Sequence, residues 1–226
     1  MKKVVLVSGK LRSGKNQFAE YLEESYIADN VSVVQDCFAQ YLKDECKNDF
    51  KPLVKYLNNV ADEILSCIPI DDQEPEIMST LMKLRTQDEN FYENKNGITR
   101  ILLQLYGTDI FRKRVDSDYW VKRMINKIKE SENEVFIITD VRFPNEINML
   151  CDESDFDVTS IRVERDIDRS GTENEHASET ALDNFKQFTY IIDNNGTLED
   201  LWNAMDVVYD ELKNGIDVNE QHEYTY

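Results

Sequence analysis

Near its N-terminus the chain carries the stretch Val4-Val5-Leu6-Val7-Ser8-Gly9-Lys10-Leu11-Arg12-Ser13-Gly14-Lys15-Asn16-Gln17. The apolar run predicts a buried strand that ends near Gly9, and a helical pattern begins at Gly14-Lys15. The G-x-x-x-x-G-K spacing between a strand and a helix is typical of a phosphate-binding loop. Glycines let backbone N–H groups surround phosphate oxygens, and the N-terminal end of the helix attracts the same anion. We therefore expect Lys15 to reach the β- and γ-phosphates of a nucleotide.

The alternative for this stretch is a glycine-containing turn that binds nothing, which its position between a strand and a helix disfavours. The expected nucleotide ligands are the loop and the start of the helix, namely Gly9, Ser13, Gly14, Lys15, Asn16 and Gln17. Asn16 stands where such loops usually have the Ser or Thr that binds Mg²⁺. We expect its carboxamide oxygen to replace that hydroxyl, directly or through a water molecule.

Length and composition indicate one folded α/β domain over residues 1–226, with 41% hydrophobic residues. The net charge of −19 argues against nucleic acid and against an anionic membrane as partners. No apolar run reaches membrane-spanning length, and no signal peptide is evident. The four cysteines lack zinc spacing, so we expect reduced thiols and a cytoplasmic protein.

Short apolar runs alternate with helical patterns along the chain, which predicts a doubly wound parallel sheet. The expected strands are residues 3–8, 31–34, 135–140, 158–163 and 190–192. The fold class is therefore a three-layer αβα P-loop NTPase domain with a five-stranded parallel sheet. Its core is expected at about 1–37 and 133–215, with a helical substrate-binding insertion at about 38–132 and a lid at about 164–181.

Helix ends and faces can also be predicted from the sequence. Thr197 and Asp200 have capping-box spacing at the start of the last helix, and Ser117 is placed to cap an earlier one. The last helix is expected to turn a single apolar stripe inward, made of Leu198, Leu201, Trp202, Met205, Val208 and Leu212. Residues 216–226 are expected to form a frayed tail.

Asp140 ends the apolar run Val135–Thr139, a position at which phosphate-loop proteins hold Mg²⁺. The alternative is an ordinary turn residue at the end of a strand. Metal ligation is therefore expected of Asp140, together with Asn16.

Because the chain is acidic overall, its arginines are informative. Planar guanidinium groups are suited to bind two phosphates that face each other. The candidate arginines are Arg12, Arg100, Arg112, Arg142, Arg162, Arg165 and Arg169. The alternative for each is an ordinary surface salt bridge. His176-Ala177-Ser178-Glu179 is consistent with a lid or a substrate clamp, or with a loop that leads into a helix capped by Ser178. No general base is evident, and an acceptor that is already an anion needs none.

The chain resembles the bacteriophage deoxynucleoside monophosphate kinases from about residue 3 to about residue 213. The resemblance rests on the loop at 9–15, Leu103-Gln104, Gly107-Thr108-Asp109 with Arg112, Trp120-Val121, Thr139-Asp140-Val141-Arg142-Phe143-Pro144-Asn145-Glu146, Arg162-Val163 and His176-Ala177-Ser178-Glu179. It implies ATP- and Mg²⁺-dependent phosphorylation of dNMP to dNDP for phage DNA precursor synthesis, in the host cytoplasm. It also implies a homodimer and a fold like that of the nucleoside monophosphate kinases.

The same resemblance assigns roles to individual residues. The catalytic set it implies is Lys15, Arg12, Asp140, Arg142 and Arg165, with Arg165 and Arg169 in the lid. The implied acceptor site comprises Phe38, Lys43, Arg100, Gln104, Trp120, Asn145, Glu146, His176 and Glu179. Gln17 replaces a frequent Thr, and Ala39-Gln40-Tyr41-Leu42-Lys43 follows the family's Ala-Asp-Pro-Leu-Lys only loosely.

Two other functions stay open at this point. The loop and Leu182-Asp183-Asn184-Phe185 are also similar to animal phosphomevalonate kinases, which phosphorylate a small phosphorylated metabolite. Gly107-Thr108 and Trp120-Val121 favour the nucleotide acceptor. A nucleotide-binding regulator without turnover is disfavoured, because a sensor does not need arginines for two phosphate subsites.

Overall fold

The computed structural model describes residues 1–44, 103–166, 177–215 and 222–224. It divides the chain into two compact units. We call Met1–Phe38 together with Asp118–Tyr226 the core unit, and Ala39–Ser117 the insertion unit. Within the helical insertion expected at about 38–132, residues 45–102 lie outside the described residues.

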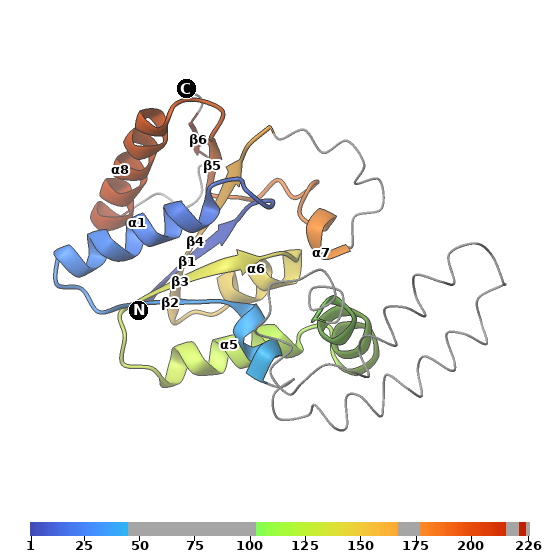
Figure 1. The fold of residues 1–226 in the computed structure, drawn as a ribbon. Coiled ribbons are helices and arrows are strands. Elements are labelled where there is room, and N and C mark those ends of the chain that lie inside the picture. Colours follow the sequence, from blue (N-terminus) through green and yellow to red (C-terminus); the bar gives the residue numbers. More distant parts are fainter. Residues whose placement is uncertain (45–102, 167–176, 216–221, 225–226) are drawn as a thin grey trace. The chain divides into compact units, whose positions relative to one another are not determined.

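The core unit is built on a parallel sheet (Figure 1). Within the described residues its strands are β1 (Lys2–Ser8), β2 (Val33–Asp36), β3 (Val135–Val141), β4 (Phe156–Glu164), β5 (Tyr190–Asp193) and β6 (His222–Tyr224). They lie in the order β2-β3-β1-β4-β5-β6, and every neighbouring pair is parallel. The five predicted strands are confirmed. The prediction of a frayed tail at 216–226 is wrong for β6, because this segment pairs with β5 as a sixth strand.

Helices cover both faces of this sheet and make three layers. They are α1 (Lys15–Ala28), α5 (Tyr119–Glu130), α6 (Pro144–Cys151) and α8 (Leu198–Asn214), and the short helix α7 (Ala177–Thr180) lies between β4 and β5 in the chain. Figure 1 shows α1 beside α8 on one face, with α5 and α6 on the other. Alternate residues of β1 point to opposite faces, so Val5 and Val7 join the buried cluster under α1 and α8. The predicted three-layer αβα class is confirmed.

The apolar stripes of the helices decide which sides face the sheet. In α5 the apolar side chains Trp120, Val121, Met124, Ile125 and Ile128 are buried, and in α8 Leu201, Met205, Val208 and Leu212 are at most 4% exposed. The expectation is wrong for Leu198 and Trp202, which are 50% and 49% exposed. These two residues lie one turn apart on the side of α8 away from the cluster.

Two capping predictions have different outcomes. The Thr197 hydroxyl accepts the Asp200 N–H, and the Asp200 carboxylate accepts the Thr197 N–H, so the capping box of α8 is confirmed. The cap at Ser117 is wrong, because α5 begins one residue later with Asp118 at its N-cap.

The insertion unit is described at both of its ends. Residues 39–44 are helical, and η2 (Leu105–Val115) is a π-helix that contains Gly107. A Cβ atom at Gly107 would lie 3.0 Å from Leu42 Cδ2, so the absent side chain lets these two segments pack closely. A π-helix was not predicted, since its i to i+5 hydrogen bonds leave no clear periodicity in sequence.

Parallel pairing brings the carboxyl ends of β1, β3 and β4 to one edge of the sheet. Ser8 at the end of β1 has Val141 as its partner on β3 and Arg162 as its partner on β4. In open α/β sheets ligands bind at this edge.

Candidate active site

The loop between β1 and α1 has the backbone that its glycines predict. Gly14 has φ +98° as the N-cap of α1, a conformation that L side chains rarely adopt. A Cβ atom at Gly9 would lie 2.7 Å from the Val163 carbonyl oxygen and 2.4 Å from Ser13 Oγ. The loop therefore turns back tightly against the end of β4, and glycine is required at both positions.

The Ser13 hydroxyl lies inside this loop. Its Oγ atom is buried and has no hydrogen-bond partner within the described residues. Asn194, buried after β5, holds the loop from outside through a 2.8 Å bond from Nδ2 to the Ser13 carbonyl. A buried hydroxyl with unused capacity is costly unless a ligand satisfies it, which fits a loop that binds phosphate oxygens.

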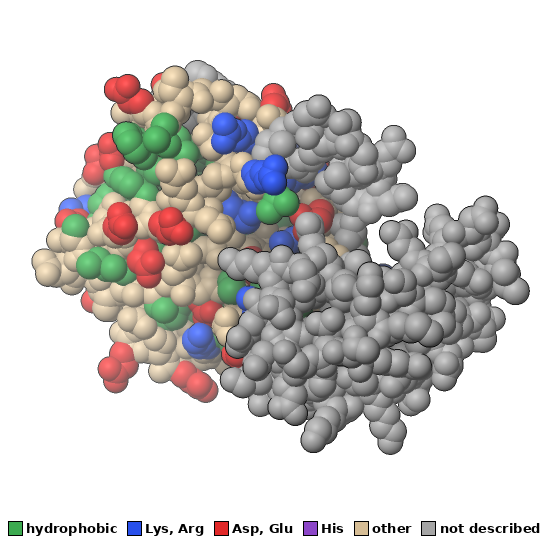
Figure 2. Space-filling view, viewed as in Figure 1, with side chains coloured by type: hydrophobic (Ala, Val, Ile, Leu, Met, Phe, Trp, Pro, Cys, Tyr) green, Lys and Arg blue, Asp and Glu red, His purple; other side chains and the backbone are tan. Residues whose placement is uncertain are grey.

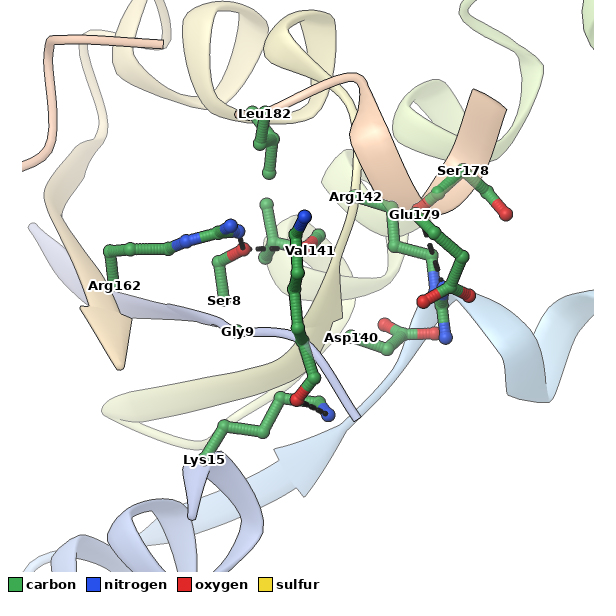
Figure 3. Close-up of a pocket in the computed structure, with 11 residues that line it drawn as sticks. Ser8, Gly9, Lys15, Asp140, Val141, Arg142, Arg162, Ser178, Glu179 and Leu182 are labelled. Carbon is green, nitrogen blue, oxygen red and sulfur yellow. Dashed lines mark hydrogen bonds and ion pairs between the residues drawn. The ribbon is translucent and has the colours of Figure 1, made fainter. Parts of the chain in front are cut away.

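Lys15 is the first residue of α1 and points into a pocket at the sheet edge (Figure 3). Its Nζ donates to the Lys10 carbonyl at 3.3 Å. Burial lowers the pKa of the Lys15 ammonium, and the Arg142 guanidinium lowers it further, while the Glu179 and Asp140 carboxylates oppose the change. A partly desolvated cation beside other cations is ready to accept an anion.

Arg142 follows β3 and approaches the pocket from the side of α7. Its Nη1 pairs with the Glu179 carboxylate and donates to the Ser178 carbonyl at 3.3 Å. Figure 3 shows the Arg142 guanidinium beside Glu179 and Asp140. Ser178 lies inside α7 and is buried, so its predicted role as a helix cap is wrong.

Asp140 lines the same pocket from the end of β3. Its Oδ1 atom accepts the Phe38 N–H at 2.7 Å. The described residues contain no group of three or more His, Cys, Asp or Glu side chains suited to a metal ion. Mg²⁺ is usually held by one or two carboxylates plus substrate phosphates, so a single carboxylate at this position fits such a metal.

The pocket as a whole is cationic. Its lining includes four basic side chains and two carboxylates, which are Lys10, Lys15, Arg142 and Arg162, and Asp140 and Glu179. Figure 2 shows basic side chains gathered over the end of β1, while acidic side chains are spread over the rest of that face. In a chain of net charge −19, a local excess of positive charge indicates a site for an anion.

Other predicted nucleotide and lid residues are not among the residues of this lining. Arg12, with φ +65°, is exposed in the loop, and Arg165 is exposed just after β4. Asn16 and Gln17 are exposed on the first turn of α1. Arg100, Arg169 and His176 lie outside the described residues.

The residues expected at the acceptor are divided between the two units. In the core unit, Phe38 and Trp120 are buried, at 5% and 2% exposure. Asn145 Nδ2 donates to Asp118 Oδ1 at 2.8 Å, and so ties the start of α6 to the start of α5. In the insertion unit, Lys43 and Gln104 are half-buried.

Glu146 has a structural task in the core unit. It is 1% exposed, and its Oε2 atom accepts the N–H groups of Arg142 and Phe143 at 2.7 and 3.0 Å. The carboxylate therefore caps α6 and fixes the backbone at Arg142.

The sequence did not indicate Ser8 and Asp183 as site residues, and it indicated Arg162 only as one of seven arginines suited to phosphates. Arg162 is 7% exposed and donates to the Ser8 hydroxyl at 3.0 Å and to Asp183 at 3.4 Å. Its position inside the apolar strand 158–163 is the signal that could have singled it out, because an arginine is almost never buried without partners.

The comparison with known families agrees with this geometry. Residues 39–205, about three quarters of the chain, match the sequence model of deoxynucleotide monophosphate kinase. The chain belongs to the deoxynucleotide monophosphate kinase family. The matched range includes Asp140, Arg142 and Glu179, and the phosphate-loop stretch precedes it.

Two relatives carry names of the same kind. The chain is 38% identical over 64 residues to the deoxynucleoside-5'-monophosphate kinase of Escherichia phage T5, a stretch that spans 28% of this chain and 26% of that protein. It is 26% identical over 217 residues to the "Putative deoxynucleotide monophosphate kinase" of Acanthamoeba polyphaga mimivirus, which covers 88% of this chain and 92% of that protein. Among the described residues, no helix of this family member is long and apolar enough to cross a membrane.

Proposed function

We propose that this protein transfers the γ-phosphoryl group of ATP to deoxynucleoside monophosphates, giving ADP and deoxynucleoside diphosphates. The observation that carries the proposal is that Lys15, from the loop after β1, and Arg142, after β3, line one cationic pocket. Family membership supports the acceptor class. Phosphoryl transfer between two phosphates needs positive charge between them, and this pocket supplies it.

The phosphate loop and the start of α1 would hold the donor. In this proposal the N–H groups around Gly9, Ser13 and Gly14 bind phosphate oxygens, with Asn16 and Gln17 on the adjoining helical turn. Lys15 would exchange its bond with the Lys10 carbonyl for the terminal phosphates. The Ser13 hydroxyl, buried without a partner among the described residues, would then gain one.

Arg142 would neutralise the charge that develops on the transferred group. Its present partner Glu179 is a carboxylate, so an incoming phosphate would compete with it for the guanidinium. The acceptor oxygen is already anionic, and for that reason no general base is assigned. Orientation and charge neutralisation then provide most of the rate enhancement.

Mg²⁺ would supply further neutralisation between the ATP phosphates, and Asp140, which lines the pocket, would hold it. Asn16 is exposed on α1 and is a second proposed ligand. Binding a metal at Asp140 would place two demands on this carboxylate, because Oδ1 also accepts the Phe38 N–H.

The acceptor site and the lid complete the proposal. Phe38, Trp120, Asn145 and Glu146 would shape one side of the acceptor site from the core unit. Lys43, Arg100 and Gln104 would contact the acceptor from the helical insertion. A lid at about 164–181 would bring Arg165, Arg169, His176 and Glu179 to the phosphates, and Arg12 would join them from the loop. Exclusion of water would prevent hydrolysis of ATP.

The proposal also covers the location, the oligomeric state and the partners of the protein. We place the protein in the cytoplasm, the host cytoplasm if it comes from a phage, as a homodimer with ATP and dNMP as its small-molecule substrates. The net charge of −19 argues against a nucleic-acid partner.

The experiment that tests the function uses the purified full chain with ATP, Mg²⁺ and each of the four common deoxynucleoside monophosphates. We expect ADP and a diphosphate product with at least one of them. Phosphomevalonate is the comparison substrate for the alternative kinase. If only phosphomevalonate is phosphorylated, the protein is the alternative kinase and the proposal is wrong. If the protein binds ATP but phosphorylates no acceptor, the result favours a nucleotide-binding regulator without turnover.

A further inference from the structure

Arg162 is a buried cation that the proposed function leaves unused. It lies at the carboxyl end of β4, where its register partner on β1 is Ser8. The residue is only 7% exposed, and Ser8 is 1% exposed. A buried guanidinium costs several kcal/mol of solvation unless its partners are well placed, so its contacts need an explanation.

The guanidinium of Arg162 joins two parts of the pocket that are distant in sequence. Nη1 donates to Ser8 Oγ at 3.0 Å, and that hydroxyl donates to the Val141 carbonyl at 3.0 Å. Nη2 donates to Asp183 Oδ1 at 3.4 Å. One planar group therefore connects the strand end before the phosphate loop to the turn that follows α7.

Asp183 extends this connection back to the loop. Its second oxygen, Oδ2, accepts from Lys10 Nζ at 2.8 Å. Asp183 thus holds Arg162 of β4 and Lys10 of the phosphate loop at the same time. Ser8, Arg162, Asp183 and Lys10 are thus linked in series by hydrogen bonds, and we call this series the bracket. The bracket encloses the start of the loop, because Ser8 and Lys10 both flank Gly9.

The side of the guanidinium is also supported. Its carbon lies 5.9 Å from the Phe188 ring centroid, and Nε lies 3.6 Å from Glu164 Oε1. A rigid, planar fork with contacts on its edge and face has little freedom to turn toward a ligand. This geometry differs from that of Arg142, which is 40% exposed at its side chain.

From this geometry we propose that Arg162 is a positioning residue for phosphoryl transfer, which fixes the start of the phosphate loop against the turn at Asp183. The inference rests on the proposed function. Arg162 acts through Ser8 and Asp183, and Lys15 and Arg142 meet the phosphates. The same turn continues from α7, which carries Glu179, so the bracket also sets where the partner of Arg142 lies.

Kinetics of four single variants and one double variant test the role of the fork. Arg162→Met removes the charge and the fork, Arg162→Lys keeps the charge alone, and Asp183→Asn weakens one arm of the bracket. Arg123→Met, at an exposed position on α5, is the matched control. We expect Arg162→Met to lower kcat about 100-fold with a smaller change in the KM for ATP, since a misplacement of about 1 Å costs this much.

The pattern among the variants separates positioning from charge. Arg162→Lys should lose nearly as much kcat as Arg162→Met, because a single ammonium nitrogen lacks the planar fork whose two separate nitrogens reach Ser8 and Asp183. Combining Arg162→Met with Asp183→Asn should lower kcat no further than Arg162→Met alone does, because the two residues belong to the same series of contacts. Full activity in Arg162→Lys, or additive losses in the double variant, would overturn the proposal.

Amide hydrogen exchange gives a second measurement that does not need activity. We expect Arg162→Met to raise exchange about tenfold at residues 8–15 and 181–185, with α8 unchanged. Uniformly faster exchange would show that Arg162 stabilises the fold in general. Unchanged exchange at both segments would contradict the proposal that the bracket holds the loop. If the wild-type chain phosphorylates no acceptor, the proposed function fails, and the exchange result alone still decides whether Arg162 holds the loop.

Discussion

Lys15 and Arg142 line one pocket, although they follow different strands of the sheet. They meet because β1 and β3 are parallel neighbours whose carboxyl ends lie at the same edge. After burial, Arg142 is the largest influence that lowers the pKa of Lys15. Two cations held together in this way destabilise the unliganded protein, and an anion between them relieves the repulsion.

Replacing Lys15 should therefore separate activity from stability. We expect Lys15→Met to reduce turnover about 10³-fold or more, the scale of losing a key charge at the transferred group. The pKa of Lys15 is lower in the folded state than in the unfolded chain, so its charged form opposes folding at all pH values below the folded pKa. Urea unfolding at pH 7 should show an unchanged or increased free energy of unfolding.

Lys186→Met, at an exposed position outside the pocket lining, is the matched control for both measurements. Near-wild-type turnover in Lys15→Met would remove this residue from the site. A large loss of stability in Lys15→Met alone would show that its ammonium supports the fold.

Arg142→Ala should affect the chemical step more than the binding of ATP. The guanidinium follows β3 and pairs with Glu179, so it comes from a different segment than the loop that would hold ATP. We expect kcat to fall about 10²- to 10³-fold, while the Kd of ATP changes less than about threefold. Steady-state kinetics and equilibrium titration measure the two quantities, with Arg123→Ala as the control. A Kd that rises as much as kcat falls would place Arg142 on the donor.

Gly9→Ala should weaken the binding of ATP by the phosphate loop. A Cβ atom would lie 2.7 Å from the Val163 carbonyl, so the backbone of the loop or of β4 must move. We expect the Kd of ATP to rise at least about tenfold, a loss of about 1.4 kcal/mol.

Gly215→Ala is the control for the cost of adding a methyl group. Gly215 has φ +86°, and nothing lies within 4 Å of the added atom, so stability should fall while ATP affinity stays the same. Equal affinity in Gly9→Ala and the wild type would show that the loop does not need this close approach.

Much of the core fold could be predicted, because its signals are local. The apolar run of β3 and the stripe of α5 specify strand and helix without knowledge of their neighbours. β6 could not be predicted, since His222-Glu223-Tyr224 has no apolar run and forms a strand by pairing with β5. Leu198 and Trp202 were misplaced because periodicity does not show how much of a helix its neighbours cover.

The site was predictable where it depends on strand ends alone. Asp140 lies at the end of an obvious strand and Arg142 follows that strand, so their position at the ligand edge could be expected. The contacts of Arg162 could not, because they depend on β4 lying beside β1 and on the path of the turn at Asp183. Strand order and turn path are set by packing between distant segments, and no spacing in the sequence records them.

The capping box of α8 should contribute to stability without affecting the reaction. Thr197 Oγ1 accepts the Asp200 N–H at 3.2 Å, and Asp200 Oδ2 accepts the Thr197 N–H at 2.7 Å. Neither residue lines the pocket. Thr197→Ala should lower the free energy of unfolding by about 1 kcal/mol at pH 7, while Thr197→Ser keeps the acceptor and loses much less. Turnover should be unchanged in both variants.

The pH dependence of this loss has a definite sign. Hydrogen bonds from the Thr197 side chain and then from its backbone lower the pKa of Asp200 below its usual range. The contribution is therefore fully present above the pKa of Asp200 in the unfolded chain, and is lost as the pH falls through the lower folded value. Urea unfolding at a series of pH values should show the difference between wild type and Thr197→Ala narrowing in acid. A difference that stays constant down to the lowest pH at which the chain folds would show that the ionised carboxylate takes no part in the cap.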